Sequence, residues 1–392
     1  MSFHAYCLAV VLFCTARYRA ICNTLKIIFN WINLCLGHFF SINRIHKCLL
    51  QLGVIYPFFL FFSSITIGLI TVFIYYNGAS KLKFFYTDIK NKFSNDKIPY
   101  VPTALDSLQP WIKAKEQVLG NVRLDNESKI IFYDSIPQKT AYSVVYLHGF
   151  TASGKEGDPV HQMVANALGA NLYIPRLYGH GLEEEEPMLN FNNEGFWESG
   201  KEALEVAKRL GEKVIILGTS HGGALGLVLA EDPQVSALAL FGPNIKVYDP
   251  KAILLSKPWG LQISRLVKGG NYHYMQTDKE EKKKYWTTKS RLEGATHMQK
   301  FLDLKMRKST FKKIELPVFL GYYYKNDSMQ DKVVSVPAML KMFDQLGTAD
   351  SLKHKVAFTD IGDHVLTASL STDEYEDVAM EAIRFLKRVL NE

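Results

Sequence analysis

The sequence predicts an α/β protein with a mainly parallel sheet and helices on both of its faces. Short apolar runs alternate with helical segments through most of the chain, which is typical of this class. Within Val214–Ala230 an apolar run, a sharp glycine-containing turn and a small-residue helix follow one another directly. The 392 residues also leave room for an N-terminal segment outside the sheet domain.

The expected strands are short and apolar, and the expected helices lie between or beside them. The predicted strands are Lys129–Tyr133, Ser143–Leu147, Asn171–Ile174, Val214–Leu217, Ala237–Phe241, Pro317–Tyr324 and Lys355–Phe358. The predicted helices are Leu108–Leu119, Pro159–Leu168, Asn193–Leu210, Gly222–Ala230 and an amphipathic helix at the C-terminus.

An insert of about seventy residues separates the strand ending at Phe241 from the one beginning at Pro317, which is far longer than an ordinary connection. It begins with apolar residues and has a highly charged middle at Lys279–Lys284. We expect residues 245–312 to form a helical cap over the sheet. Such a cap sets the size of the substrate and excludes water.

The pentapeptide Gly218–Gly222 has the pattern Gly-x-Ser-x-Gly and lies directly after the apolar run Val214–Leu217. A strand, a sharp turn and a helix around this pattern form a nucleophile elbow, in which the serine hydroxyl points outward from a strained turn. The glycines are needed because side chains there collide with neighbouring backbone. We therefore expect Ser220 to be a nucleophile; the alternative is an ordinary structural turn.

A serine nucleophile needs a base and a third group that orients the base. Among the histidines after Ser220, His364 lies in a loop between the last predicted strand and the C-terminal helix, which favours it as the base. The acid is expected in the loop after Pro317–Tyr324. Asp331 is the preferred candidate and Asp327 the alternative, and either residue could instead be a solvated loop residue.

An ester-cleaving site also needs backbone N–H donors for the oxyanion. One is expected from His221, the residue after the nucleophile, and the other from the loop His148–Thr151 that follows the strand Ser143–Leu147. Gly149 permits a close approach of the backbone, and Phe150 would offer its N–H. The alternative is a simple turn at the end of the strand.

Residues from about 125 to 392 resemble an α/β-hydrolase of the esterase and lipase type, similar to bacterial carboxylesterases and monoacylglycerol lipases. The resemblance is carried by four segments: His148–Ala152, Pro175–Gly181, Gly218–Gly222 and Gly362–Val365. It implies Ser220 as nucleophile, His364 as base, Asp331 as orienting acid, and N–H donors at Phe150 and His221. The acid loop is several residues longer than in the usual pattern.

The N-terminal part contains a charge-free run from Cys48 to Ser80. Its apolar core, residues 52–76, is long enough to cross about 30 Å of hydrocarbon, so we expect a single transmembrane helix there. Basic residues and no acid precede it, which favours a cytoplasmic N-terminus and an extracytoplasmic hydrolase. Lys81 and Lys83 after the helix, and a second apolar run at Ile27–Phe40, favour the reverse.

This gives four expected parts: a basic extension with all five cysteines (1–51), the membrane helix (52–76), a linker (77–121) and the hydrolase domain (122–392). The whole chain has a net charge of +7. Residues 1–100 carry +8, so the remainder carries about −1. The basic balance therefore belongs to the membrane flanks, and no nucleic-acid partner is expected. No motif indicates a cofactor or a metal site.

These features together predict a membrane-anchored serine hydrolase that cleaves acyl esters, with lipid-derived esters as plausible substrates beside a bilayer. A peptidase of the same fold is the alternative within enzymes. A non-catalytic, hydrolase-like binding module at the membrane is the alternative from another class, although such a module has no need to keep all three residues of the triad.

Overall fold

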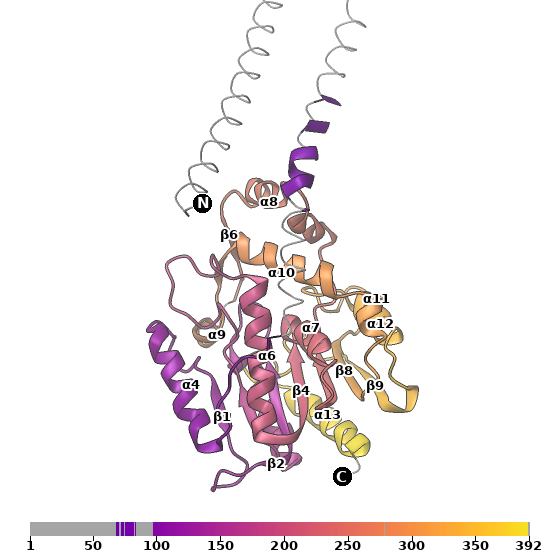
Figure 1. The fold of residues 1–392 in the computed structure, drawn as a ribbon. Helices are drawn as coiled ribbons and strands as arrows, with labels where there is room; N and C mark the ends of the chain where they lie inside the picture. Colours follow the sequence, from indigo (N-terminus) through magenta and orange to yellow (C-terminus); the bar gives the residue numbers. More distant parts are fainter. Residues whose placement is uncertain are drawn as a thin grey trace, which may run out of the picture. The chain divides into compact units, whose positions relative to one another are not determined.

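The computed structural model describes residues 97–277 and 279–390, and a helical stretch at residues 68–69, 72–73, 75–81 and 83 (Figure 1). The chain divides into two compact units, Met1–Tyr76 and Asn77–Glu392. The predicted extension at 1–51 and most of the predicted membrane helix at 52–76 lie outside the described residues. Among the residues that are described, no helix is long and apolar enough to cross a bilayer.

A seven-stranded sheet lies at the centre of the larger unit, with the strand order β1-β3-β2-β4-β5-β8-β9 (Figure 1). Only β1 runs antiparallel, against β3; the other neighbours are parallel. The predicted, mainly parallel sheet is confirmed. The strands are β1 Lys129–Ile131, β2 Thr140–Leu147, β3 Asn171–Ile174, β4 Gly211–Thr219, β5 Val235–Phe241, β8 Val318–Tyr323 and β9 Lys353–Phe358.

Helices cover both faces of this sheet, because successive side chains of a strand point to opposite sides. In β2, Val145 and Leu147 belong to one core and Val144 and Tyr146 to the other. Helices α6 and α7 pack on the first face, α5 and α13 on the second. The helices outside the cap are α4 Leu105–Leu119, α5 Val160–Ala167, α6 Asn193–Leu210, α7 Ser220–Leu229, α12 Val336–Asp344 and α13 Tyr375–Leu390. Two short 3-10 helices are η1 Gly154–Gly157 and η3 Asp350–Leu352.

The insert between β5 and β8, which we call the cap, contains two strands in addition to the expected helices. Strands β6 and β7 pair antiparallel in a small separate sheet, which the sequence analysis did not predict. The helices of the insert are η2 Pro250–Ser256, α8 Gly260–Lys268, α9 Glu280–Tyr285, α10 Leu292–Lys305 and α11 Lys308–Phe311. The two strands are β6 Tyr272–Tyr274 and β7 Lys289–Arg291. Helix α10 packs against η2, α6 and α7 and so joins the cap to the sheet domain.

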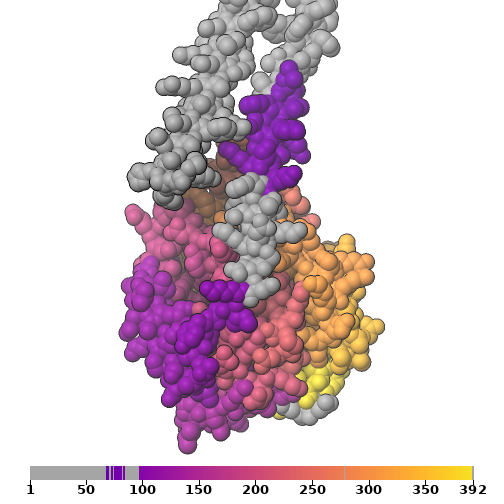
Figure 2. Space-filling view, viewed as in Figure 1, coloured from indigo at the N-terminus to yellow at the C-terminus, as the bar shows by residue number. Residues whose placement is uncertain are grey.

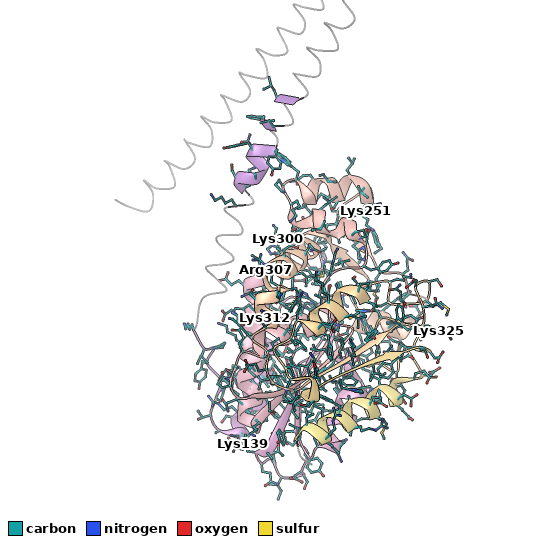
Figure 3. All side chains as sticks on the ribbon, turned by 90° about the vertical axis from the view of Figure 1, so that its right-hand side faces the viewer. Lys139, Lys251, Lys300, Arg307, Lys312 and Lys325 are labelled. Atoms are coloured by element: carbon teal, nitrogen blue, oxygen red, sulfur yellow. The ribbon has the colours of Figure 1, made fainter. Side chains whose placement is uncertain are left out.

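The two sides of the domain are formed by different parts of the chain. The purple segment that includes α4 lies on one side, and the orange and yellow C-terminal part lies on the other (Figure 2). The basic residues Lys139, Lys251 and Lys325 lie at widely separated places on the domain (Figure 3).

Candidate active site

Ser220 occupies the turn between β4 and α7. Its φ of 53° lies in the left-handed region, which residues other than glycine rarely adopt. The backbone is tightly packed there: a Cβ at Gly222 would lie 2.0 Å from the Leu147 carbonyl oxygen, and one at Gly218 would lie 2.8 Å from the Gly223 Cα. The structure therefore has the strand, strained turn and helix that the pentapeptide predicts.

The loop that follows β2 lies beside this serine. A Cβ at Gly149 would stand 3.0 Å from the Cβ of Ser220. The Phe150 N–H has no backbone acceptor among the described residues. His221 is the second residue of α7, where an amide has no acceptor one turn earlier in its own helix. Both amides are thus suited to receive an oxyanion that forms next to Ser220.

His364 and Asp331 are brought together from the loops after β9 and β8. The Nδ1 of His364 lies 2.6 Å from the Oδ2 of Asp331, and Asp331 is only 1% exposed. The other carboxylate oxygen of Asp331 accepts the amides of Val333 and Val334, at 2.8 and 3.0 Å. Asp327, the alternative acid, is exposed and accepts the Tyr324 hydroxyl instead. The geometry pairs His364 with Asp331.

The segment after β5 connects the histidine to the serine. A Cβ at Gly242 would lie 3.3 Å from the Cε1 of His364, and the Asn244 amide donates to the Ser220 carbonyl at 2.8 Å. The Nε2 of His364 is buried and has no hydrogen-bond partner among the described residues. This nitrogen, opposite the one held by Asp331, is the atom that a base in this position would use.

The surroundings of His364 stabilise its charged form. Burial alone would lower the pKa of the imidazole. The charge of Asp331 and its hydrogen bond outweigh burial and raise the pKa above its ordinary value of 6.5, with smaller contributions from Glu156 and Asp363. Such an imidazole is a stronger base than a free one, and its protonated form is stabilised as soon as it accepts a proton.

Three other histidines form a neutral aromatic cluster close to the loop after β2. The rings of His148 and His180 are 4.9 Å apart, and the ring of His221 stacks on Phe196 at 4.6 Å. Burial lowers the pKa of His221 to about 3 and of His180 to about 4, and it holds the pKa of His148 well below its usual range. Because burial makes these imidazoles poor proton acceptors, His221 is suited to contribute through its amide and not as a base.

One buried carboxyl at the site was missed by the sequence analysis. Glu156, in η1, is 2% exposed, and its Oε2 accepts the Gly149 amide at 2.6 Å and the Tyr146 hydroxyl at 3.1 Å. In the sequence Glu156 is one acid in an unremarkable polar loop after the His148–Ala152 segment. Only its position among residues distant in the chain distinguishes it.

The cap touches the site at several points. The Lys282 Nζ of α9 lies 2.9 Å from the Oδ2 of Asp363, the residue before His364. The Thr287 amide donates to the carbonyl of Thr151 at 2.7 Å, in the loop that carries Phe150. The cap is therefore attached both to the loop of the histidine and to the loop of the proposed oxyanion donor.

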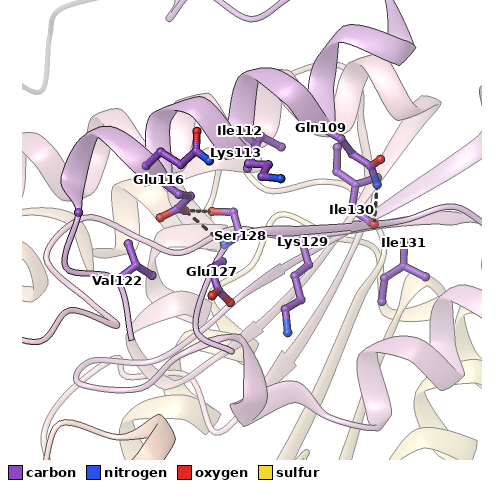
Figure 4. A pocket seen from close by; sticks show the side chains of 12 residues that line it. Gln109, Ile112, Lys113, Glu116, Val122, Glu127, Ser128, Lys129, Ile130 and Ile131 are labelled. Atoms are coloured by element: carbon purple, nitrogen blue, oxygen red, sulfur yellow. Dashed lines mark hydrogen bonds between the residues drawn. The ribbon is translucent and has the colours of Figure 1, made fainter. Parts of the chain in front are cut away.

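A separate cavity of about 800 Å³ lies between α4 and β1 (Figure 4). The Glu116 carboxylate at its edge accepts the Ser128 hydroxyl at 2.8 Å and pairs with Arg176 at 2.8 Å. Its lining includes none of the residues of the candidate triad. Within the described part of the chain, no group of three or more His, Cys, Asp or Glu side chains is arranged to hold a metal ion.

Solved structures resemble this chain in fold. One, from work on the metagenome-derived lipolytic enzymes LipS and LipT, has a TM-score of 0.56 at 16% identity, covering 68% of this chain and 99% of that chain. A soluble variant of monoglyceride lipase from Saccharomyces cerevisiae has a TM-score of 0.50 at 13% identity, covering 67% and 92%. No family model and no curated protein matches the chain. The likenesses show that the chain has the α/β-hydrolase fold.

Proposed function

We propose that this protein is a serine hydrolase that cleaves carboxylic esters through an acyl-enzyme intermediate. Two observations together carry the proposal. The backbone of Ser220, at the end of β4, has a left-handed conformation, and His364 is hydrogen-bonded at 2.6 Å to the buried Asp331. A structural turn needs neither the strained serine nor an orienting acid behind the histidine.

In the proposed reaction the Ser220 hydroxyl attacks the ester carbonyl while the Nε2 of His364 takes its proton. Asp331 keeps the imidazole in the tautomer that leaves Nε2 free to accept, and it stabilises the imidazolium that forms. The Phe150 and His221 amides hold the oxyanion of the tetrahedral intermediate. His364 then gives the proton to the leaving alcohol, and water releases the acid from Ser220 by the same steps in reverse.

Lipid-derived esters are the proposed substrate class. Of the two structural neighbours described above, one comes from work on lipolytic enzymes and the other is a monoglyceride lipase. The cap itself exposes apolar side chains, with Leu266 84% and Val267 76% exposed on α8, and clustered apolar exposure is a common sign of contact with lipid or protein. Anchoring through residues 52–76 is part of the same proposal and rests on their apolar, charge-free sequence.

The experiment is fluorophosphonate labelling and p-nitrophenyl ester hydrolysis by the full-length protein in detergent, across acyl chain lengths, with Ser220→Ala as control. Labelling and chain-length-dependent turnover that the substitution abolishes support the proposal. Labelling without ester turnover favours the peptidase, and the absence of both favours the binding module. Resistance of the protein to extraction from membranes at alkaline pH, lost when residues 1–76 are deleted, tests the anchor separately.

A further inference from the structure

The buried carboxyl of Glu156 takes no direct part in the proposed reaction. It lies against the loop after β2 so closely that a Cβ at Gly149 would stand 2.8 Å from its Oε1. The same carboxyl accepts the Gly149 amide at 2.6 Å through Oε2. A short hydrogen bond from a backbone amide to a carboxylate is among the stronger bonds a loop can make. Glu156 therefore holds the backbone one residue before the proposed oxyanion donor Phe150.

A hydrogen-bond network extends from Glu156 to the other parts of the site. The Tyr146 hydroxyl bonds both Glu156 and the Oγ1 of Thr219, the residue before Ser220, at 3.1 and 2.9 Å. Thr219 in turn lies 3.3 Å from the Oγ1 of Thr367, which donates to the Glu156 carbonyl at 2.7 Å. The network thus joins the loop after β2, the elbow and the segment that follows His364, and all of its members are buried.

We propose that Glu156 is a positioning residue of this site: its carboxyl fixes the Gly149 amide, and so directs the neighbouring Phe150 N–H toward the ester oxygen. The inference rests on the proposed esterase function. It concerns the geometry of the oxyanion donors, which the roles of Ser220, His364 and Asp331 do not determine.

The charges around Glu156 come from several elements. Tyr146 lies on β2, Lys282 on α9, and His364 and Asp363 in the loop after β9. The ring of His161 in α5 packs edge-to-face with the Tyr146 ring, at 5.1 Å between their centroids. Burial raises the pKa of Glu156 to about 7, and the Gly149 amide, His364, Tyr146 and Lys282 limit that rise. When it is ionised, this carboxylate favours the protonated form of His364.

Two substitutions separate holding the loop from filling the space. Glu156→Gln keeps an acceptor for the Gly149 amide and loses the charge, whereas Glu156→Met has a similar length and no strong acceptor. We expect Glu156→Met to lower kcat about 100-fold or more with KM within about threefold, because misplacement by about 1 Å costs rates of that order. Glu156→Gln should stay within about tenfold of wild-type kcat. Its acid limb of kcat/KM should move to lower pH, since a negative charge near His364 is gone.

Full-length wild type and variants are compared in detergent by ester turnover, by fluorophosphonate labelling rate and by thermal melting. Glu116→Gln is the matched control, because Glu116 is a partly buried carboxylate that pairs with Arg176 outside the site; its kcat and acid limb should equal those of wild type. Wild-type kcat in Glu156→Met overturns the proposal, as does a Glu156→Gln variant whose kcat is as low as that of the Met variant.

If Glu156→Met does not fold, the acid limb of Glu156→Gln decides: a downward shift supports the role and an unchanged limb overturns it. A wild type that neither labels nor turns over overturns the esterase proposal and this one together, whereas an active wild type with indifferent variants overturns only this one.

Discussion

Replacing Gly222 by alanine puts one methyl group into the closest backbone contact of the site. The new Cβ would lie 2.0 Å from the carbonyl oxygen of Leu147 and 2.5 Å from that of His148. Ordinary contacts of this kind need about 3.4 Å or more. The start of α7 and the end of β2 must therefore separate by about 1.4 Å before the new methyl group and the Leu147 oxygen reach an ordinary contact distance. No flexible side chain is available to absorb this shift, because both clashing atoms belong to the backbone.

That separation carries the His221 amide away from the Phe150 amide, since one begins α7 and the other follows β2. A misplacement of about 1 Å in a reacting group costs roughly 100-fold in rate, which corresponds to about 2.7 kcal/mol of transition-state stabilisation. We expect Gly222→Ala to lose at least that much kcat in p-nitrophenyl ester hydrolysis and to label with fluorophosphonate correspondingly slowly.

Gly226→Ala is the matched control on the same helix. Its Cβ would meet only side-chain atoms, the Cγ2 of Ile216 at 3.1 Å and the Cδ1 of Leu147 at 3.9 Å, and alanine is favoured over glycine inside a helix by about 1 kcal/mol. It should keep near-wild-type kcat. A folded Gly222→Ala protein whose kcat/KM lies within threefold of wild type would refute the reasoning, because the two amides would then not depend on this contact.

Three further predictions concern the base, the acid and a partly buried ion pair. Only a neutral His364 can accept the serine proton, so activity is lost as pH falls through its pKa; because that pKa is raised, the acid limb of kcat/KM should lie above pH 6.5, and a limb at or below pH 6 contradicts the environment described. Asp331→Asn should reduce kcat by roughly 1,000-fold or more, whereas Asp327→Asn should leave kcat near wild type. Steady-state kinetics check this, and the opposite result would make Asp327 the acid. Arg176→Met leaves the partly buried Glu116 carboxylate without its ion partner and should lower the free energy of unfolding by about 2 kcal/mol with little effect on KM. A denaturant midpoint equal to wild type would show that the pair contributes nothing.

Apolar periodicity was enough to predict most of the sheet domain. The bounds expected for Asn171–Ile174 and for Asn193–Leu210 are those of β3 and α6, because a buried strand and a long amphipathic helix show their patterns locally. The two-stranded sheet of β6 and β7 could not be predicted in this way. Tyr272–Tyr274 and Lys289–Arg291 carry polar or half-exposed side chains and are separated by α9, so neither shows the alternation of a half-buried strand.

The candidate site divides in a similar way. Ser220 and the loop at Gly149 could be predicted because the strained turn and the close backbone approach require glycine and serine at fixed spacing. The choice between Asp331 and Asp327 depended on which loop residue reaches His364, and that is a matter of tertiary geometry. Glu156 could not be predicted, because its surroundings are assembled from β2, the elbow and the segment after His364.

The two edges of the sheet differ in how they are protected against pairing with another copy of the chain. One edge strand, β1, lies beside α4, whereas the other, β9, is partly open and carries Lys353 and Lys355 among its exposed or half-exposed residues. Lysines on an edge strand oppose pairing with the same strand of another copy, because like charges would meet at close range. Two copies of this domain therefore gain little from joining their sheets at β9, and a raised protein concentration should not promote aggregation through this strand.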